Sequence, residues 1–320
     1  MSKTEPESFQ QGDAYRNSRP GGVIVREVTC RSALVRSGIP GVDYVINPYS
    51  GCLHRCVYCY ASFMSRFHGH EGEWGTWADA KVNVAQILRK EMLLSRRVLS
   101  PGLQLGEHPA APPRVLRVMM SSVTDPYQPP ERAYKLTRSC LEILSQLGKS
   151  GGWSASFKWE ALELSILTKS DLVVRDLDIL QDIPNAEVGM TITNPVDSIS
   201  KRYEPGASPS SRRFEALRRM SSAGLRTWGF FGPVLPYHSD TPGVIREMLA
   251  RFRDAGVRRV LVDRFNPYPS AVARFRQVAH PDAVLALNEY LKNPLAYLDH
   301  LRETVLESAT SLGIEVELCF

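Results

Sequence analysis

The middle of the chain alternates between short apolar runs and longer segments with helical periodicity. The short runs are typical of buried strands, whereas the longer segments place apolar residues three or four positions apart, along one face of a helix. The predicted strands lie at 43–47, 115–119, 162–167, 187–192, 225–231 and 259–262. The predicted helices lie at 82–99, 131–147, 171–181, 211–223, 242–255, 281–291 and 294–312. Such alternation predicts parallel βαβ units with right-handed crossovers.

Six strands in this arrangement build either a doubly wound sheet or a barrel. A last strand is predicted at 314–319, after the two closing helices. We therefore divide the chain into a flexible N-terminal arm and packing segment over 1–40, an α/β domain over 41–266, and a helical extension over 267–320 that ends in the last strand. The arm is predicted because its start is polar and rich in Gly and Pro.

Composition and charge add little to this picture. The chain has 320 residues and a net charge of +5. No run approaches the ~18 apolar residues of a membrane span, and the first residues lack the apolar core of a secretory signal. These features predict a cytoplasmic protein with no membrane partner. The mild charge fits ordinary solubility better than a nucleic-acid partner, although one predicted helix carries four arginines that suit either phosphate contacts or a solvated face.

The candidate chemistry lies in the cysteines. Three of the six fall within eight residues, namely Cys52, Cys56 and Cys59. Without a secretory signal, such clustering indicates a metal or redox site rather than a disulfide framework. Thiolates are the usual ligands of iron–sulfur clusters, and three of them leave one iron of a [4Fe–4S] cubane open. The alternative is a non-enzymatic zinc module, which His54, or His68 and His70, would complete.

The spacing Cys-x3-Cys-x-aromatic-Cys resembles the signature of the radical S-adenosylmethionine (SAM) superfamily. The longer stretch over 47–61, Asn-Pro-Tyr-Ser-Gly-Cys-Leu-His-Arg-Cys-Val-Tyr-Cys-Tyr-Ala, resembles the branch that contains spore photoproduct lyase. The resemblance extends to about residue 266 and implies a partial (β/α)6 TIM-like barrel, in agreement with the six predicted strands. It also implies a [4Fe–4S] cluster on the three cysteines, with SAM bound at the open iron.

The resemblance further implies the reaction. One electron, from a flavodoxin- or ferredoxin-type donor, would reduce the cluster. The reduced cluster would cleave SAM, usually to methionine and a 5′-deoxyadenosyl radical. That radical would abstract hydrogen from a substrate, so that the cofactor supplies the chemistry and the protein supplies position.

The SAM contacts are expected where strands end, because α/β proteins bind ligands at the carboxyl ends of parallel strands. Ser122 and Asp125 follow the strand at 115–119 and can hydrogen-bond an amino-acid zwitterion. The family's common Gly-Gly-Glu type of sequence is absent there, and the lyase branch resembles the chain better. Lys169 follows the strand at 162–167 in a Thr-Lys-Ser step that the resemblance marks as a SAM contact, and its ammonium suits the SAM carboxylate.

Further SAM contacts are expected in the next loops. A hydroxyl of Thr191 or Thr193 would meet the methionyl carboxylate or the ribose. The Tyr-Glu-Pro…Arg layout resembles the family's segment near SAM, where Glu204 would take ribose hydroxyls or anchor its loop. Arg213 would act in the same segment or lie on the surface of its helix. The family position of Tyr58 contacts adenine, which implies the same for Tyr58.

The substrate and the catalytic residues stay open. The lyases that the chain resembles use a cysteine near the end of their second core strand, and the stretch 119–122 has none. Cys140 shares a predicted helical face with apolar residues and is interpreted as a packing residue. Cys319, at the end of the last strand, is the open catalytic candidate. We therefore expect a small-molecule or peptide-sized substrate, with repair of a nucleic-acid lesion as the alternative. The substrate pocket is expected among Trp228, Phe230, Tyr237, His238, Asp263 and Tyr268.

Overall fold

The computed structural model describes residues 17–19, 22–67, 70, 73–94, 115–149 and 161–320. Its main feature is an eight-stranded sheet in the order β12-β11-β10-β9-β8-β7-β4-β3. The strands are β3 (Val35–Arg36), β4 (Tyr44–Ile46), β7 (Val115–Met120), β8 (Ala161–Thr168), β9 (Ala186–Thr191), β10 (Arg226–Val234), β11 (Arg259–Arg264) and β12 (Glu315–Leu318). Every neighbouring pair from β4 to β12 is parallel, and β3 runs antiparallel to β4. The sheet therefore has two ends and does not close.

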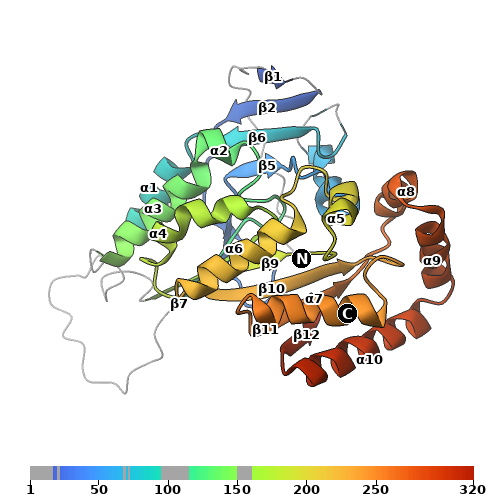
Figure 1. Ribbon diagram of the computed structural model, residues 1–320. Coiled ribbons are helices and arrows are strands. Elements are labelled where there is room, and N and C mark those ends of the chain that lie inside the picture. Colours follow the sequence, from blue (N-terminus) through green and yellow to red (C-terminus); the bar gives the residue numbers. More distant parts are fainter. Residues whose placement is uncertain (1–16, 20–21, 68–69, 71–72, 95–114, 150–160) are drawn as a thin grey trace.

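Helices connect the successive parallel strands (Figure 1). They are α1 (Val84–Leu94), α2 (Glu131–Tyr134), α3 (Leu136–Lys149), η2 (Asp171–Asp176), α4 (Leu177–Leu180), α5 (Asp197–Tyr203), α6 (Ser210–Ser222) and α7 (Pro242–Asp254). The helix α6 packs against β9 and β10. Leu164 and Ile166 of β8 share one buried cluster with Leu144 of α3, so the core lies between the strands and the helices. The predicted partial (β/α)6 barrel is confirmed, with β4 and β7 to β11 as its six strands.

One predicted helix, at 131–147, is broken into α2 and α3. Lys135 separates them with a left-handed backbone, at φ 53°. The carboxylate of Glu131 accepts hydrogen bonds from the backbone N–H groups of Thr137, at 3.0 Å, and Arg138, at 3.2 Å. It thereby satisfies N–H groups that the first turn of α3 leaves unpaired. The sequence pattern missed the break because both helices face the same core.

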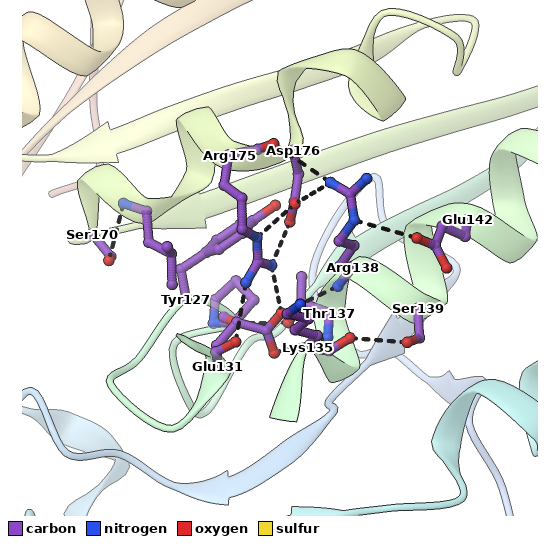
Figure 2. Close-up of polar contacts among 12 residues, drawn as sticks. Tyr127, Glu131, Lys135, Thr137, Arg138, Ser139, Glu142, Ser170, Arg175 and Asp176 are labelled. Atoms are coloured by element: carbon purple, nitrogen blue, oxygen red, sulfur yellow. Dashed lines mark hydrogen bonds and ion pairs between the residues drawn. The ribbon is translucent and has the colours of Figure 1, made fainter. Parts of the chain in front are cut away.

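A network of charges surrounds this carboxylate, as Figure 2 shows. The guanidinium of Arg175 contacts Glu131 and Asp176, each at 2.7 Å, and Arg138 contacts Asp176 at 2.8 Å. Glu131 and Asp176 are fully buried, and each has a cationic partner, as buried carboxylates require. The network ties the helices after β7 to η2 after β8. The hydroxyl of Ser170 caps the start of η2, because it accepts a hydrogen bond from the Leu172 N–H at 3.3 Å.

A second, four-stranded sheet was not predicted from the sequence. Its order is β1 (Asn17–Arg19), β2 (Val23–Val28), β6 (Trp77–Lys81) and β5 (Tyr49–Gly51). Figure 1 shows it as a separate layer above the barrel strands. Within the predicted arm and packing segment over 1–40, Asn17–Arg19 and Val23–Val28 therefore form β1 and β2, whereas residues 1–16 lie outside the described residues. The strand β5 leads into the candidate chemistry, because the cysteine loop begins directly after it.

The C-terminal part consists of α8 (Pro269–Val278), α9 (Pro281–Lys292), α10 (Pro294–Leu312) and β12. The last two helices match their predicted bounds to within a residue, and α8 was not predicted. Proline stands at the first position of all three helices, where its missing N–H has no cost. Within the described ranges, no helix is both long and apolar enough to cross a membrane.

Cys140 has the packing position that its pattern predicts. It lies on α3 with no exposed surface, among the apolar residues of the main core, and burial raises the pKa of its thiol. Cys140→Ala removes one buried sulfur and should lower the free energy of unfolding by about 1 kcal/mol, measured by urea denaturation. SAM cleavage should persist in the variant. A loss of turnover at unchanged stability would show that the packing role is wrong.

Candidate cofactor site

The cysteine loop starts from a backbone turn that only glycine can make. Gly51 has φ +73°, and a Cβ built there would lie 2.5 Å from the ring of Trp77 and 2.6 Å from its carbonyl oxygen. Both the left-handed backbone and the contact exclude a side chain. The glycine that precedes Cys52 in the motif therefore lets the loop leave β5 against β6.

A buried amide fixes the start of the loop. Gln128, which has no exposed surface, accepts a hydrogen bond from the Leu53 N–H at 2.9 Å and donates one to the Gly51 carbonyl at 3.1 Å. These two partners flank Cys52. Two residues upstream of Gly51, the Tyr49 hydroxyl donates to Glu131 at 2.6 Å. The segment after β7 thus holds the backbone on both sides of the first cysteine.

The three cysteines of the motif line one cavity of about 310 Å³. Five of the eight residues predicted to contact SAM line the same cavity, namely Tyr58, Ser122, Asp125, Lys169 and Thr191. Burial raises the pKa of all three thiols, and that of Cys56 to about 12. Free of metal, these groups are thiols at neutral pH, so that binding of iron would displace their protons.

Within the described ranges, no three His, Cys, Asp or Glu residues converge closely enough to hold a single metal ion. The three thiols therefore share a cavity wall without meeting at one point. A cubane cluster takes each thiolate on a different iron. Three separate thiols around one cavity are consistent with that demand, and their soft sulfur donors suit iron–sulfur chemistry.

Asp125 joins the cysteine loop to the end of β8. Its carboxylate accepts hydrogen bonds from the Thr168 hydroxyl, at 2.7 Å, and from the backbone N–H groups of Tyr127 and Lys169, both at 2.8 Å. Nδ1 of His54 lies 3.3 Å from the same carboxylate. Burial opposes ionisation, yet the His54 charge and these hydrogen bonds lower the pKa of Asp125 to about 2. With both oxygens occupied, Asp125 fits the role of a positioning residue better than that of a direct SAM contact.

Lys169 brings a positive charge to the cavity wall, which also carries Asp263 and Arg264. Its backbone is held between Asp125 and Ser208, whose N–H donates to the Lys169 carbonyl at 3.1 Å. Its ammonium lies 5.6 Å from the centroid of the Tyr58 ring and makes no hydrogen bond or ion pair with any described residue. The charge acts on the thiols of Cys56 and Cys59, where it opposes the rise in pKa. The ammonium is therefore available to an anionic ligand.

Glu204 and Arg213 form a buried ion pair behind the cavity. Arg213 Nη2 lies 2.5 Å from Glu204 Oε2, and both side chains are at most 1% exposed. Arg213 also donates to the carbonyls of Ser208, at 2.7 Å, and Thr191, at 2.9 Å. The alternative that Arg213 lies on the surface of its helix is wrong, because its side chain is buried and pairs with Glu204.

The Glu204 carboxylate has further partners within the protein. It accepts hydrogen bonds from the hydroxyls of Tyr58 and, at 3.3 Å, Thr193. Burial raises its pKa, but the charges of Arg213 and Lys169 outweigh burial and hold that pKa below its ordinary value. Thr193, Glu204 and Arg213 do not line the cavity. Their geometry fits the predicted anchoring of the loop and of Tyr58 better than direct contact with ribose.

The wall at the end of β7 contains a residue that the sequence did not single out. Ser122 donates its N–H to Asn47 at 3.1 Å, and its carbonyl accepts from the Tyr60 hydroxyl. Its neighbour Ser121 is 2% exposed, has φ +66°, and its hydroxyl has no hydrogen-bond partner among the described residues. Both serines line the cavity. The Ser-Ser step was visible in the sequence, but nothing in it distinguished the strained first serine.

The open catalytic candidate and most of the residues expected in a substrate pocket do not line the cavity. Cys319 is exposed and lies at the end of β12, where its N–H donates to the Val262 carbonyl at 2.9 Å. It does not line the cavity, and burial raises the pKa of its thiol, with a further rise from the charge of neighbouring Asp263. Asp263 and Phe230 do line the cavity, unlike the other four residues expected in a substrate pocket.

Comparison with protein families decides how this cavity is to be understood. The family model of the radical SAM superfamily matches residues 46–242, which is more than half of the chain. The chain belongs to the radical SAM superfamily. The match starts in β4, includes the cysteine loop and ends at the start of α7. Radical SAM membership implies a [4Fe–4S] cluster and SAM as cofactors.

Two relatives of this radical SAM protein align with it over most of their own length. An uncharacterized protein of Methanocaldococcus jannaschii is 34% identical over 225 residues, which cover 70% of this chain and 73% of that protein. An uncharacterized protein of Mycobacterium bovis is 28% identical over 302 residues, which cover 89% of this chain and 79% of the relative.

Two solved structures of radical SAM proteins share the fold. Spore photoproduct lyase complexed with dinucleoside spore photoproduct has a TM-score of 0.58 at 14% identity, over 92% of this chain and 82% of the lyase. SuiB of Streptococcus suis bound to S-adenosylmethionine has a TM-score of 0.51 at 13% identity, over 86% of this chain and 49% of SuiB. The predicted resemblance to the lyase is thereby confirmed at the level of the fold.

Proposed function

We propose that this protein is a radical SAM enzyme in which Cys52, Cys56 and Cys59 ligate a [4Fe–4S] cluster and the adjoining cavity binds SAM. The observation that carries the proposal is the gathering of three thiols and one free ammonium, that of Lys169, around a single cavity. When bound and reduced, the cluster supplies the electron that cleaves SAM, usually to methionine and a 5′-deoxyadenosyl radical that abstracts a hydrogen atom from the substrate.

The protein's own residues bind the cluster and orient SAM. The cysteines give up their protons to ligate iron. The Lys169 ammonium pairs with the SAM carboxylate through a charge-assisted hydrogen bond. The Glu204–Arg213 pair holds Tyr58 beside the adenine, while Ser122 and Thr191 offer polar contacts to the methionyl and ribose groups. The cavity walls keep water away from the reacting atoms.

We propose an unidentified small-molecule or peptide-sized substrate. Apart from the three cysteines of the motif, no cysteine lines the cavity formed by the described residues, so a lyase-type cysteine hydrogen donor has no place in its wall. The spore photoproduct lyase structure holds a dinucleoside lesion, and a second SuiB structure holds its precursor peptide. The missing cysteine favours chemistry unlike that of the lyase.

The test is anaerobic reconstitution followed by incubation with SAM and dithionite. Four irons per chain and a brown protein are expected, with release of 5′-deoxyadenosine and methionine. A colourless protein that binds one zinc ion and leaves SAM intact would contradict the proposal. Cleavage of a different carbon–sulfur bond of SAM would support the two proposed cofactors but would show that the radical formed is not 5′-deoxyadenosyl.

Replacement of Lys169 tests the SAM site by itself. In a partly dry cavity the charge-assisted bond contributes about 1.5–3 kcal/mol. Lys169→Met keeps the apolar stem, so SAM affinity should fall by roughly ten- to hundredfold. Isothermal titration of the reconstituted protein measures this loss, and iron content should stay at four because no thiolate changes. Lys292→Met, on exposed α9, is the matched control. If Lys169→Met binds SAM with an affinity within about twofold of the wild type, Lys169 does not contact the SAM carboxylate.

A further inference from the structure

The C-terminal helix α8 contacts the cysteine loop, and its most extensive polar contact there is made by Arg274. Its Nε donates to the Val57 carbonyl at 2.8 Å. Its Nη2 donates to the Cys59 carbonyl at 3.2 Å and to the Ser62 hydroxyl at 3.3 Å. One guanidinium thus hydrogen-bonds to the backbone on both sides of Tyr58. This contact comes from outside residues 46–242, the part of the chain that matches the family.

The hydrogen-bond partners of this guanidinium carry no charge. Arg274 is partly buried. No carboxylate of the described residues forms an ion pair with it, and all three of its acceptors are neutral. The Glu73 carboxylate acts on the guanidinium through its charge but forms no ion pair with it, and a partly buried cation without an ion-pair partner is unfavourable. The position of Arg274 becomes favourable when a negatively charged group, such as a cluster with its thiolate ligands, binds nearby.

The thiolates that ligate the cluster supply such charge once iron is bound. Lys169 and Arg274 both place a positive charge beside the cysteine loop: the Lys169 ammonium lies 5.6 Å from the centroid of the Tyr58 ring, and Arg274 donates to the Val57 and Cys59 carbonyls. Lys169 lies on the cavity wall, where an anionic ligand can neutralise it. Arg274 is not part of that wall and has no such ligand. Its charge is therefore directed at the loop that carries Cys56 and Cys59.

We propose that Arg274 is a positioning residue that sets the reduction potential of the cluster and fixes the loop that carries its last two cysteines. This inference rests on the proposed function, because it presupposes the [4Fe–4S] cluster. One-electron reduction by a donor such as dithionite adds one negative charge to the cluster. A fixed cation nearby stabilises the reduced form more than the oxidised form, by Coulomb's law. The cation thus makes the cluster easier to reduce.

Two variants separate the charge from the hydrogen bonds. Arg274→Gln removes the charge and keeps a donor. Arg274→Lys keeps the charge, but its ammonium lacks the planar fork that spans two carbonyls. Arg276→Gln, two positions on in the same helix, removes an exposed arginine that contacts Asn288 and is the matched control. The midpoint potential of each reconstituted protein is measured by dithionite titration, followed by electron paramagnetic resonance of the reduced cluster.

The reduction equilibrium constant of Arg274→Gln should fall by roughly tenfold, a lowering of ~59 mV for a one-electron couple. Arg274→Lys should keep its midpoint potential near the wild-type value but lose iron faster to a chelator. Arg276→Gln should change neither. Should Arg274→Gln fail to hold four irons, Arg274→Lys decides: a wild-type potential supports the proposal, and a potential lowered as far as ~59 mV overturns it.

Equal potentials in Arg274→Gln and the wild type would also overturn the inference, as would equal shifts in Arg274→Gln and Arg276→Gln. Failure of the proposed function is distinguishable, because the wild-type protein itself would then hold no [4Fe–4S] cluster and give no reducible signal.

Discussion

Replacing Cys56 by alanine is expected to abolish cluster binding and SAM cleavage. Cys56 is the most buried of the three motif cysteines, and its thiol lines the cavity beside Lys169. With one thiolate lost, two irons of a cubane lack protein ligands, and a two-point attachment exposes the cluster to loss. We expect iron to fall from four per chain to below one, and SAM cleavage to fall by more than a hundredfold. Iron and sulfide analysis of the anaerobically reconstituted protein measures the first effect.

Cys319→Ala serves as the matched control for this loss. Cys319 is a free cysteine that lies outside the cavity, so its removal should leave four irons and an unchanged absorbance spectrum. The control also tests Cys319 as the catalytic candidate, because a loaded variant that cleaves SAM but no longer converts substrate would mark it as catalytic. Four irons in a Cys56→Ala protein that still cleaves SAM would refute the cluster assignment.

Replacing Arg213 is expected to have the largest effect on stability. Its guanidinium and the Glu204 carboxylate are both buried, so Arg213→Met leaves a carboxylate in the core without its cationic partner. Breaking a buried pair in this way costs about 3–5 kcal/mol. The variant also loses hydrogen bonds to two carbonyls, one of which belongs to the cavity residue Thr191. Urea denaturation should show the loss in the free energy of unfolding.

Two further proteins test the cause of this loss. Arg218→Met, on the same helix α6, breaks only an exposed pair with Glu215 and should cost less than about 1 kcal/mol. The double variant Glu204→Gln, Arg213→Met buries no unpaired charge, so it should be more stable than Arg213→Met alone. If Arg213→Met were as stable as Arg218→Met, the buried pair would not hold the loop together.

The barrel was largely predictable because its strands are short apolar runs separated by helical periods. Each of the six runs became a strand, and the buried positions of β7 and β8 alternate along the strand, as expected where one face packs against the core. The second sheet was not predictable in the same way. Its β5 is Tyr49–Gly51, three residues within a motif, and it pairs with β6 across 25 residues of intervening sequence that show no period. Pairing at such distance leaves no local pattern.

The candidate site was predictable where chemistry is local and unpredictable where it depends on packing. The cysteine motif and Lys169 follow from spacing and from strand ends. The roles of Asp125, Glu204 and Arg213 could not be divided between ligand contact and support, because that depends on which partners burial brings to each group. Arg274 gave no signal, since an arginine in an amphipathic helix ordinarily faces water. Its contact with the Cys59 carbonyl spans 215 positions of sequence.

The two ends of the main sheet bear on how the protein behaves in concentrated solution. An edge strand offers unpaired N–H and C=O groups to other chains, and long flat edges promote aggregation. Here one edge is β3, with two residues, and the other is β12, whose exposed positions are Glu315 and Glu317. A two-residue edge is too short a template for another strand, and repeated carboxylates on the other repel a second copy. The sheet can thus stay open without recruiting neighbouring molecules edge to edge.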